Sequence, residues 1–175
     1  DQLELLVRKD GFGGMRLHLS RQDDPSVLAS ADQDRLWQRV KELGVSFIVL
    51  GKAEDLPSLE PMFDRFPDVK VVLDHLVGAP VEESPARPLL ANVLKMGRYP
   101  NIYVKISNMN ATSKLPYPHQ DTFGMVQEIF NVFGPKRLMW GTDFPHVQRK
   151  GGYVQALQLV RDKLEFLSDL DKEWR

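Results

Sequence analysis

Five short apolar runs recur along the chain, and amphipathic segments fill the stretches between them. The apolar runs occupy residues 15–19, 46–50, 70–76, 102–107 and 137–141. Between the runs, apolar residues fall at helical spacing, as Leu36, Trp37, Val40 and Leu43 do. Regular alternation of strand and helix is typical of an α/β domain with a parallel sheet. The pattern predicts five parallel strands within a single domain, residues 1–175.

Local signals predict where several helices begin and end. Ser30 and Gln33 fit a capping box in front of the first long helix, and Gly44 is suited to close that helix. Pro88 is tolerated in the first turn of a later helix. The helix after that is expected to stop at Gly134, which a proline follows.

The spacing of the apolar runs fits two α/β architectures. Their starts lie 24 to 35 residues apart. Eight units of about 30 residues would make the roughly 250 residues of a closed (β/α)8 barrel. The five units of this chain therefore fit either part of a TIM barrel or a complete five-stranded doubly wound sheet.

Side-chain parity within the strands favours the barrel. Arg16 and His18 share one face of their strand, while Leu17 and Leu19 take the other. A central strand of a doubly wound sheet has helices on both faces and is apolar on both. A barrel strand needs apolar residues only towards its helices, so polar groups can line the lumen. We therefore expect a partial (β/α)8 barrel, with the doubly wound sheet as the alternative.

Composition excludes several classes of protein and of site. The formal net charge is −1, which argues against a strongly basic nucleic-acid surface. No apolar run approaches the ~20 residues that cross a bilayer, and 42% hydrophobic with 27% charged residues is typical of a soluble globular protein. The chain has no cysteine, which excludes disulfides, thiolate catalysis and cysteine-ligated zinc. A cytoplasmic setting is the resulting expectation.

Two of the predicted strands end beside a carboxylate and an imidazole. Asp74 and His75 follow the third apolar run, and Asp143 and His146 follow the fifth. Active sites of barrels lie at the carboxyl ends of the strands, because the following loops gather there. His75 and Asp143 are therefore the candidate catalytic residues, and also candidate ligands for zinc or manganese. The alternatives are structural: a hydrogen-bonded histidine and an aspartate that caps a turn.

Further polar residues near the strand ends are candidates for substrate binding. The planar guanidinium of Arg16 is suited to hold a substrate carboxylate. His18, Lys105 and His146 are the other candidates. Arg16 and Lys105 can equally pair with carboxylates in the barrel lumen. A carboxylate such as Asp143 can take a proton from water and return it to the leaving group.

Four segments together resemble the amidohydrolase-2 family, the metal-dependent hydrolases and lactonases of TIM-barrel fold. The segments are GFGGMRLHL, FPDVKVVLDHLVGAP, PNIYVKIS and RLMWGTDFPH. They resemble the fourth, sixth, seventh and eighth strands of the family's barrel, with SFIVL as the fifth. The GTDFP sequence is the most specific part, and DHL comes next. The resemblance implies that His75 and Asp143 are site residues, with Asp143 as general base or proton shuttle.

The chain also departs from the family pattern. Nothing in it matches the H-x-H pair of metal ligands on the family's first strand, and the fifth strand continues as VLGKAED without the histidine that many members carry. We therefore expect the carboxyl-terminal part of a barrel, truncated at both ends. A divalent metal is expected to bind weakly or not at all. Only His75 and Asp143 remain as ligands, so this chain alone is expected to be inactive.

The leading hypothesis is that the intact parent enzyme hydrolyses a small carboxylate-bearing lactone, ester or amide. A metal, Asp143 or both would activate the attacking water. A decarboxylase of the same superfamily is the first alternative, and a non-catalytic binding protein derived from the barrel is the second. The expected partner is a small-molecule substrate, with no nucleic acid and no membrane, and a homo-oligomer is a further hypothesis.

Overall fold

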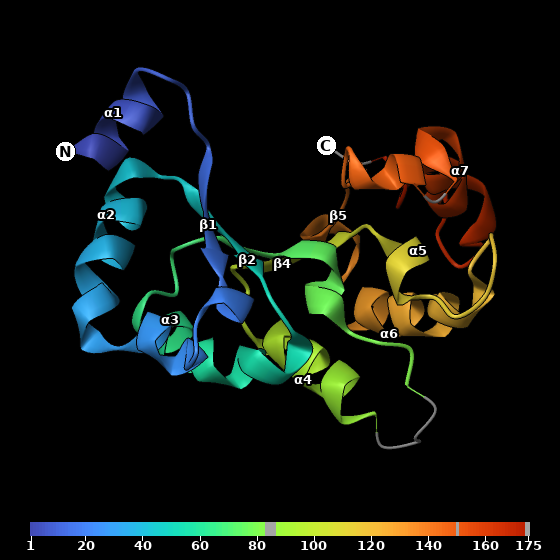
Figure 1. The fold of residues 1–175 in the computed structure, drawn as a ribbon, viewed down its shortest axis with the longest axis horizontal. Helices are drawn as coiled ribbons and strands as arrows, with labels where there is room; N and C mark the ends of the chain where they lie inside the picture. Colours follow the sequence, from blue (N-terminus) through green and yellow to red (C-terminus); the bar gives the residue numbers. More distant parts are fainter. Residues whose placement is uncertain (83–86, 150, 174–175) are drawn as a thin grey trace.

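A computed structural model describes residues 1–82, 87–149 and 151–173. All five predicted strands form one sheet with parallel neighbours in the order β1-β2-β3-β4-β5 (Figure 1). The strands are β1 Gly14–His18, β2 Ser46–Leu50, β3 Val71–Leu73, β4 Ile102–Ile106 and β5 Leu138–Trp140. In a doubly wound sheet the order in which strands are added reverses at a switch point, so the strand order in the sheet differs from the order in the chain. The observed order therefore confirms the barrel prediction.

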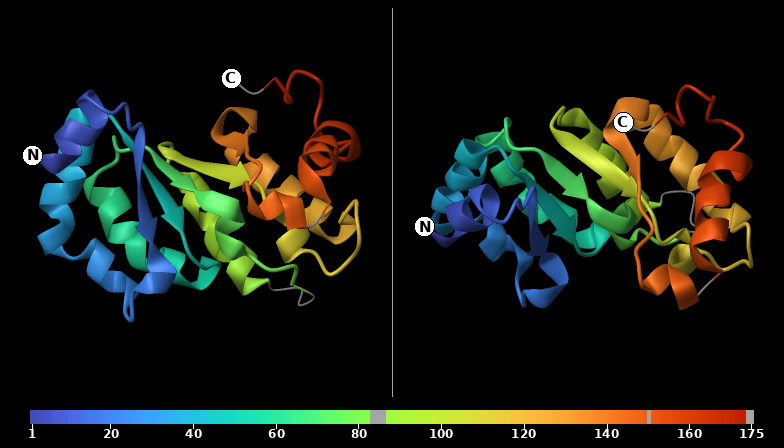
Figure 2. Two further views of the ribbon diagram at one scale, coloured as in Figure 1. Left: turned by 45° about the horizontal axis from the view of Figure 1, so that its top comes forward. Right: turned by 90° about the horizontal axis from the view of Figure 1, so that it is seen from above.

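The larger helices follow the strands around one side of the sheet. The seven α-helices of the described residues are α1 Gln2–Arg8, α2 Asp34–Leu43, α3 Glu60–Arg65, α4 Pro88–Lys95, α5 Met109–Thr112, α6 Phe123–Phe133 and α7 Gly152–Gln158. Figures 1 and 2 show α2, α3, α4 and α6 one after another along the outer side of the strands. α5 and α7 lie beyond β5, at the other end of the molecule from α1.

Most of the predicted helix ends are confirmed. Gly44 ends α2 in the left-handed conformation, with φ of 68°, and Pro88 lies in the first turn of α4. The predicted capping box is wrong. Residues 31–33 form a separate 3-10 turn, so α2 begins at Asp34 and Ser30 lies one turn too early. The Ser30 hydroxyl instead donates to the carbonyl of Val27.

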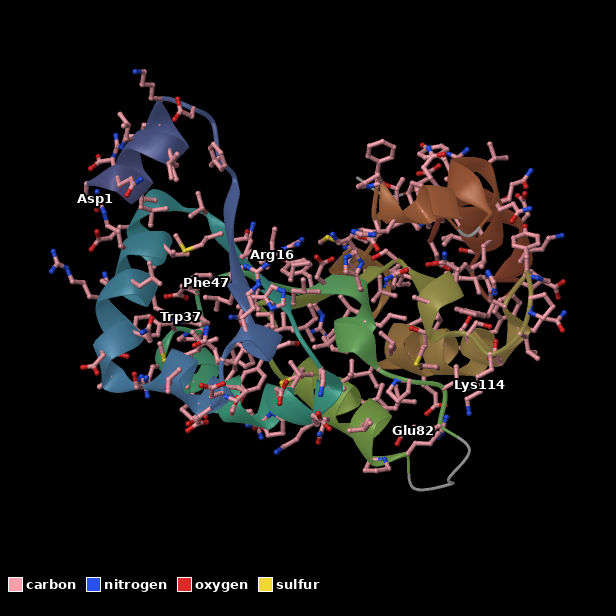
Figure 3. The ribbon with its side chains drawn as sticks, in the orientation of Figure 1. Asp1, Arg16, Trp37, Phe47, Glu82 and Lys114 are labelled. Atoms are coloured by element: carbon pink, nitrogen blue, oxygen red, sulfur yellow. The ribbon has the colours of Figure 1, made fainter. Side chains whose placement is uncertain are left out.

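Alternation along the strands separates a buried face from a lumen face. Phe47 on β2 is fully buried, and its ring packs at a tilt against Trp37 of α2, with 4.5 Å between the ring centroids; Figure 3 labels both residues. In β4, Val104 is buried towards the helices, while Tyr103 and Lys105 are partly exposed on the other face. Aromatic pairs of this kind add to the stabilisation from burial. The core therefore lies between the sheet and its outer helices, and polar side chains occupy the lumen face.

The third strand is shorter than predicted. The apolar run suggests a strand to residue 76, but β3 ends at Leu73. His75, Leu76 and Val77 then form a left-handed turn, with φ of 53°, 55° and 51°. Such a turn costs about 1–2 kcal/mol per residue. Leu76 and Val77 are fully buried, and burial of each side chain returns about 1.5–3 kcal/mol. Tertiary packing therefore overrides the strand pattern here.

Among the described residues, no helix has the length and apolar character needed to cross a membrane.

Candidate functional site

The carboxyl ends of the parallel strands meet at one rim, and a pocket of about 410 Å³ opens there. Its polar wall is formed by side chains from separate strand ends and loops. These are Arg16, His75, Asn108, Asn110, Asp143 and His146. Arg16 comes from β1 itself, and the others come from the segments that follow β3, β4 and β5. Residues up to 130 positions apart therefore share one wall.

Asp74 lies at the base of this site and contacts two cations. Its side chain is fully buried, directly after β3. Arg16 donates from Nη2 to Asp74 Oδ2 at 2.7 Å. Lys105 Nζ lies 2.6 Å from Oδ1 but off the hydrogen-bond direction, so this contact is an ion pair. A buried carboxylate needs such partners to remain charged. Asp74 was predicted to lie at a strand end, and no role was predicted for it.

Gly141 gives Lys105 the space to reach Asp74. A Cβ atom at Gly141 would lie 2.8 Å from Cδ of Lys105, closer than such contacts occur. The absence of a side chain at the end of β5 therefore lets the lysine stem pass from β4 towards the base of the site.

His75 is held between a hydroxyl and two carboxylates. Ser107 Oγ lies 2.6 Å from Nδ1, and Asp143 Oδ1 and Asp74 Oδ2 lie 3.3 Å and 3.5 Å from Nε2. Carboxylates only accept hydrogen bonds, so we assign the hydrogen to Nε2 and the Ser107 hydroxyl as donor to Nδ1. Burial lowers the pKa of His75 below its ordinary value, although the negative charges of Asp74 and Asp143 act to raise it. The ring is therefore neutral at neutral pH.

Three rim residues have left-handed backbone conformations. They are His75, Asn108 and Asp143, with φ of 53°, 59° and 57°. Each follows a different strand, and the conformation turns the chain sharply where the strand ends. Non-glycine residues adopt this conformation infrequently and at a cost in energy, and such positions cluster at functional sites. Asn108 is a pocket residue that the sequence analysis did not identify.

The candidate residues differ in their position relative to the pocket. Arg16, His75, Asp143 and His146 line it together. Lys105 turns to Asp74 below, as the lumen ion-pair alternative describes. His18 does not line this pocket, and its buried Nδ1 has no hydrogen-bond partner among the described residues. The substrate-binding and catalytic roles of all these residues remain predictions.

The donor set falls short of a complete metal site. His75 and Asp143 offer two donors, while both oxygens of Asp74 already face Arg16 and Lys105. Across residues 1–82, 87–149 and 151–173, no group of three or more histidines and carboxylates is placed to hold an ion. A catalytic zinc takes three protein ligands. The described residues therefore do not fit a zinc site by themselves.

Similar proteins include characterised lactone hydrolases. The chain is 27% identical over 159 residues to the L-fucono-1,5-lactonase of Burkholderia ambifaria, covering 85% of this chain and 51% of the relative. It is 28% identical over 121 residues to the 2-pyrone-4,6-dicarboxylate hydrolase of Comamonas testosteroni, covering 64% of this chain and 39% of the relative. The chain thus spans about half the length, or less, of these curated relatives.

The fold is also that of solved amidohydrolases. A crystal structure of an amidohydrolase from Burkholderia multivorans with bound zinc superposes with a TM-score of 0.85 at 22% identity. The match covers 98% of this chain and 64% of that one, so the five strands correspond to part of a larger barrel. The model of the family described as Amidohydrolase matches residues 1–175. The chain therefore belongs to the amidohydrolase family.

Proposed function

We propose that this site opens the ring of a small carboxylate-bearing lactone by hydrolysis. The observation that carries the proposal is the joint placement of a guanidinium and a carboxylate-imidazole pair, Arg16 with Asp143 and His75, in one pocket. One group can hold an anionic substrate, and the others can handle a proton. The lactone hydrolases among the relatives support ring opening as the reaction class.

Asp143 acts as the general base in this proposal. Its carboxylate accepts a proton from a water molecule, and the oxygen of that water attacks the lactone carbonyl carbon. The ring C–O bond then breaks, and Asp143 returns the proton to the departing alkoxide oxygen. The neutral His75 ring lies beside Asp143, with Nε2 3.3 Å from Oδ1, and its position beside the carboxylate can orient that group. Hydrolysis requires a group that takes a proton from water and then gives it to the leaving oxygen, and Asp143 serves both steps.

Arg16 binds the substrate carboxylate in this proposal. One nitrogen of its guanidinium is engaged by Asp74, and about half of the side chain remains exposed to the pocket. The remaining N–H groups of the planar fork can hold a carboxylate, and Asp74 fixes the direction in which they point. Arg16 thereby sets the position of the lactone ring relative to Asp143 and the water molecule that Asp143 activates.

We also propose that the site is completed within a longer polypeptide. Coverage of only 39–64% of the similar chains supports this, as does the two-donor set at His75 and Asp143. In a longer enzyme, further strands between the edges of β1 and β5 would close the barrel and supply the remaining ligands if a divalent metal is used. The reaction would then belong to the longer protein, in line with the expected inactivity of this chain alone.

The experiment that tests the proposed function compares ring opening with loss of carbon dioxide. The intact enzyme is incubated with a panel of lactone carboxylates and hydroxybenzoates, and products are followed by proton NMR and by trapped CO₂. Ring opening of at least one lactone without CO₂ release supports hydrolysis. CO₂ release alone identifies a decarboxylase, and binding without turnover of any compound identifies a binding protein.

A further inference from the structure

We infer that the described part of this site takes a single anionic group of the substrate in one pocket and an uncharged end of the substrate in the next. The inference rests on the proposed function for the identity of the reacting ring. The evidence for this inference is a pair of adjoining pockets. The pocket of about 410 Å³ at the rim is continued by a second of about 320 Å³, and both are lined by Leu50, His75, Asn108 and Ala111.

The first pocket holds the charged groups. Arg16, Asp143 and His146 line it and do not line the second. Arg16 is the one lysine or arginine among the described residues that line either pocket. The other cation nearby, Lys105, is committed to the buried Asp74. One cationic side chain is therefore presented to a ligand, and it lies in the first pocket.

The second pocket is uncharged. Beyond the shared residues it is lined by Gly78, Pro80 and Thr112. Gly78 and Pro80 come from the segment after β3, and Thr112 ends the short helix α5. Among the described residues of its wall there is no aspartate, glutamate, lysine or arginine. A methyl group, a ring edge or a hydroxyl fits these surroundings, whereas a carboxylate there would lose water without gaining a cation.

The charge balance among the described residues of the site leads to the same conclusion. Arg16 and Lys105 are balanced by Asp74 and Asp143, so the four groups sum to zero. One substrate carboxylate on Arg16 leaves the occupied site with a single negative charge. A second substrate carboxylate would find no free cation and would be repelled by the carboxylate of Asp143. We expect a dianion to bind roughly 10- to 100-fold more weakly than a matched monoanion.

Binding of two benzoates tests this inference without any reaction. The probes are 3-methylbenzoate, a monoanion, and isophthalate, which has a second carboxylate in place of the methyl group. Dissociation constants are measured by ligand-observed NMR titration at constant ionic strength. We expect the dissociation constant of 3-methylbenzoate to be roughly 10- to 100-fold lower than that of isophthalate. Equal or tighter binding of isophthalate, or no binding of either probe, would overturn it.

A charge placed in the second pocket provides the matched variant. Ala111 is exposed and lines both pockets, and Leu115 is exposed four residues further on but lines neither. Ala111→Lys is expected to reduce the preference for the monoanion by about tenfold, while Leu115→Lys leaves it unchanged. The same change in both variants would show a general charge effect and would overturn the assignment to this pocket.

A parallel assay separates this inference from the proposed function. Ring opening of 2-pyrone-6-carboxylate by the intact enzyme is followed alongside binding measurements on the same protein. Selective binding of 3-methylbenzoate without ring opening of any lactone supports the charge selectivity and overturns hydrolysis. Ring opening that is faster for 2-pyrone-4,6-dicarboxylate than for the monocarboxylate supports hydrolysis and overturns the selectivity.

Discussion

Ser107 and His75 lie 32 residues apart in the chain and are joined by a 2.6 Å hydrogen bond between Oγ and Nδ1. Ser107 is almost fully buried directly after β4, and His75 lies in the left-handed turn after β3. The bond therefore crosses between neighbouring strand ends and fixes the ring of His75. Its other nitrogen is directed towards the carboxylates of Asp74 and Asp143.

Ser107→Ala is expected to lower kcat of the intact enzyme roughly 10- to 100-fold, with a small change in KM. The ring of His75 loses its one hydroxyl partner and can turn away from Asp143, while Arg16 still holds the substrate. Steady-state kinetics checks this. Ser107→Thr keeps the hydroxyl and is expected to restore most of the rate. Equal losses in both variants would indicate a packing defect instead of a lost hydrogen bond.

Asp74→Asn is expected to destabilise the fold by about 1–3 kcal/mol. The substitution leaves Arg16 and Lys105 side by side without a charged partner, and the partial exposure of both side chains limits the cost. Chemical denaturation measures the free energy of unfolding. Asp68→Asn is the matched control, because Asp68 pairs with Lys41 on the surface and its loss costs ~1 kcal/mol or less. Equal effects of the two variants would argue against the buried charge cluster.

Stability is expected to fall as the pH drops below about 6.5, the ordinary pKa of histidine, in part because of His75. Burial lowers the pKa of His75 in the folded protein, so the unfolded chain binds the proton more readily. The stabilisation is complete above the unfolded pKa and is lost as the pH falls towards the folded pKa. Unfolding free energies of the wild type and His75→Gln between pH 5 and pH 8 measure this part. A parallel pH dependence in both proteins would contradict it.

The barrel fold was predictable from the sequence where the alternation of side chains within a single strand indicates it. The parity of Arg16 and His18 against Leu17 and Leu19 indicated a lumen face, and the strand order agrees. The end of β3 was not predictable in this way. The sequence VVLDHL has the apolar residues of a strand and gives no local sign that the strand ends at Leu73. Only the burial of Leu76 and Val77 against other elements favours the left-handed turn.

The site was predictable only in its strand-end residues. Asp143 and His75 stand in recognisable motifs, and both reach the pocket. The arrangement around Asp74 joins residues from β1 and β4, and no local pattern specifies which lumen cations turn to the same carboxylate. The same holds for Ser107, whose hydroxyl has a partner only because β3 and β4 are neighbours.

The most direct test of the account is the kcat of the intact enzyme carrying Asp143→Asn, measured on a lactone that the wild type opens. Asparagine keeps the size and one carbonyl oxygen of Asp143 but cannot accept the proton from water at neutral pH. The account predicts a fall in kcat of about 10²- to 10⁴-fold, with folding and most substrate binding retained. A kcat equal to that of the wild type would contradict the assignment of Asp143 as the general base.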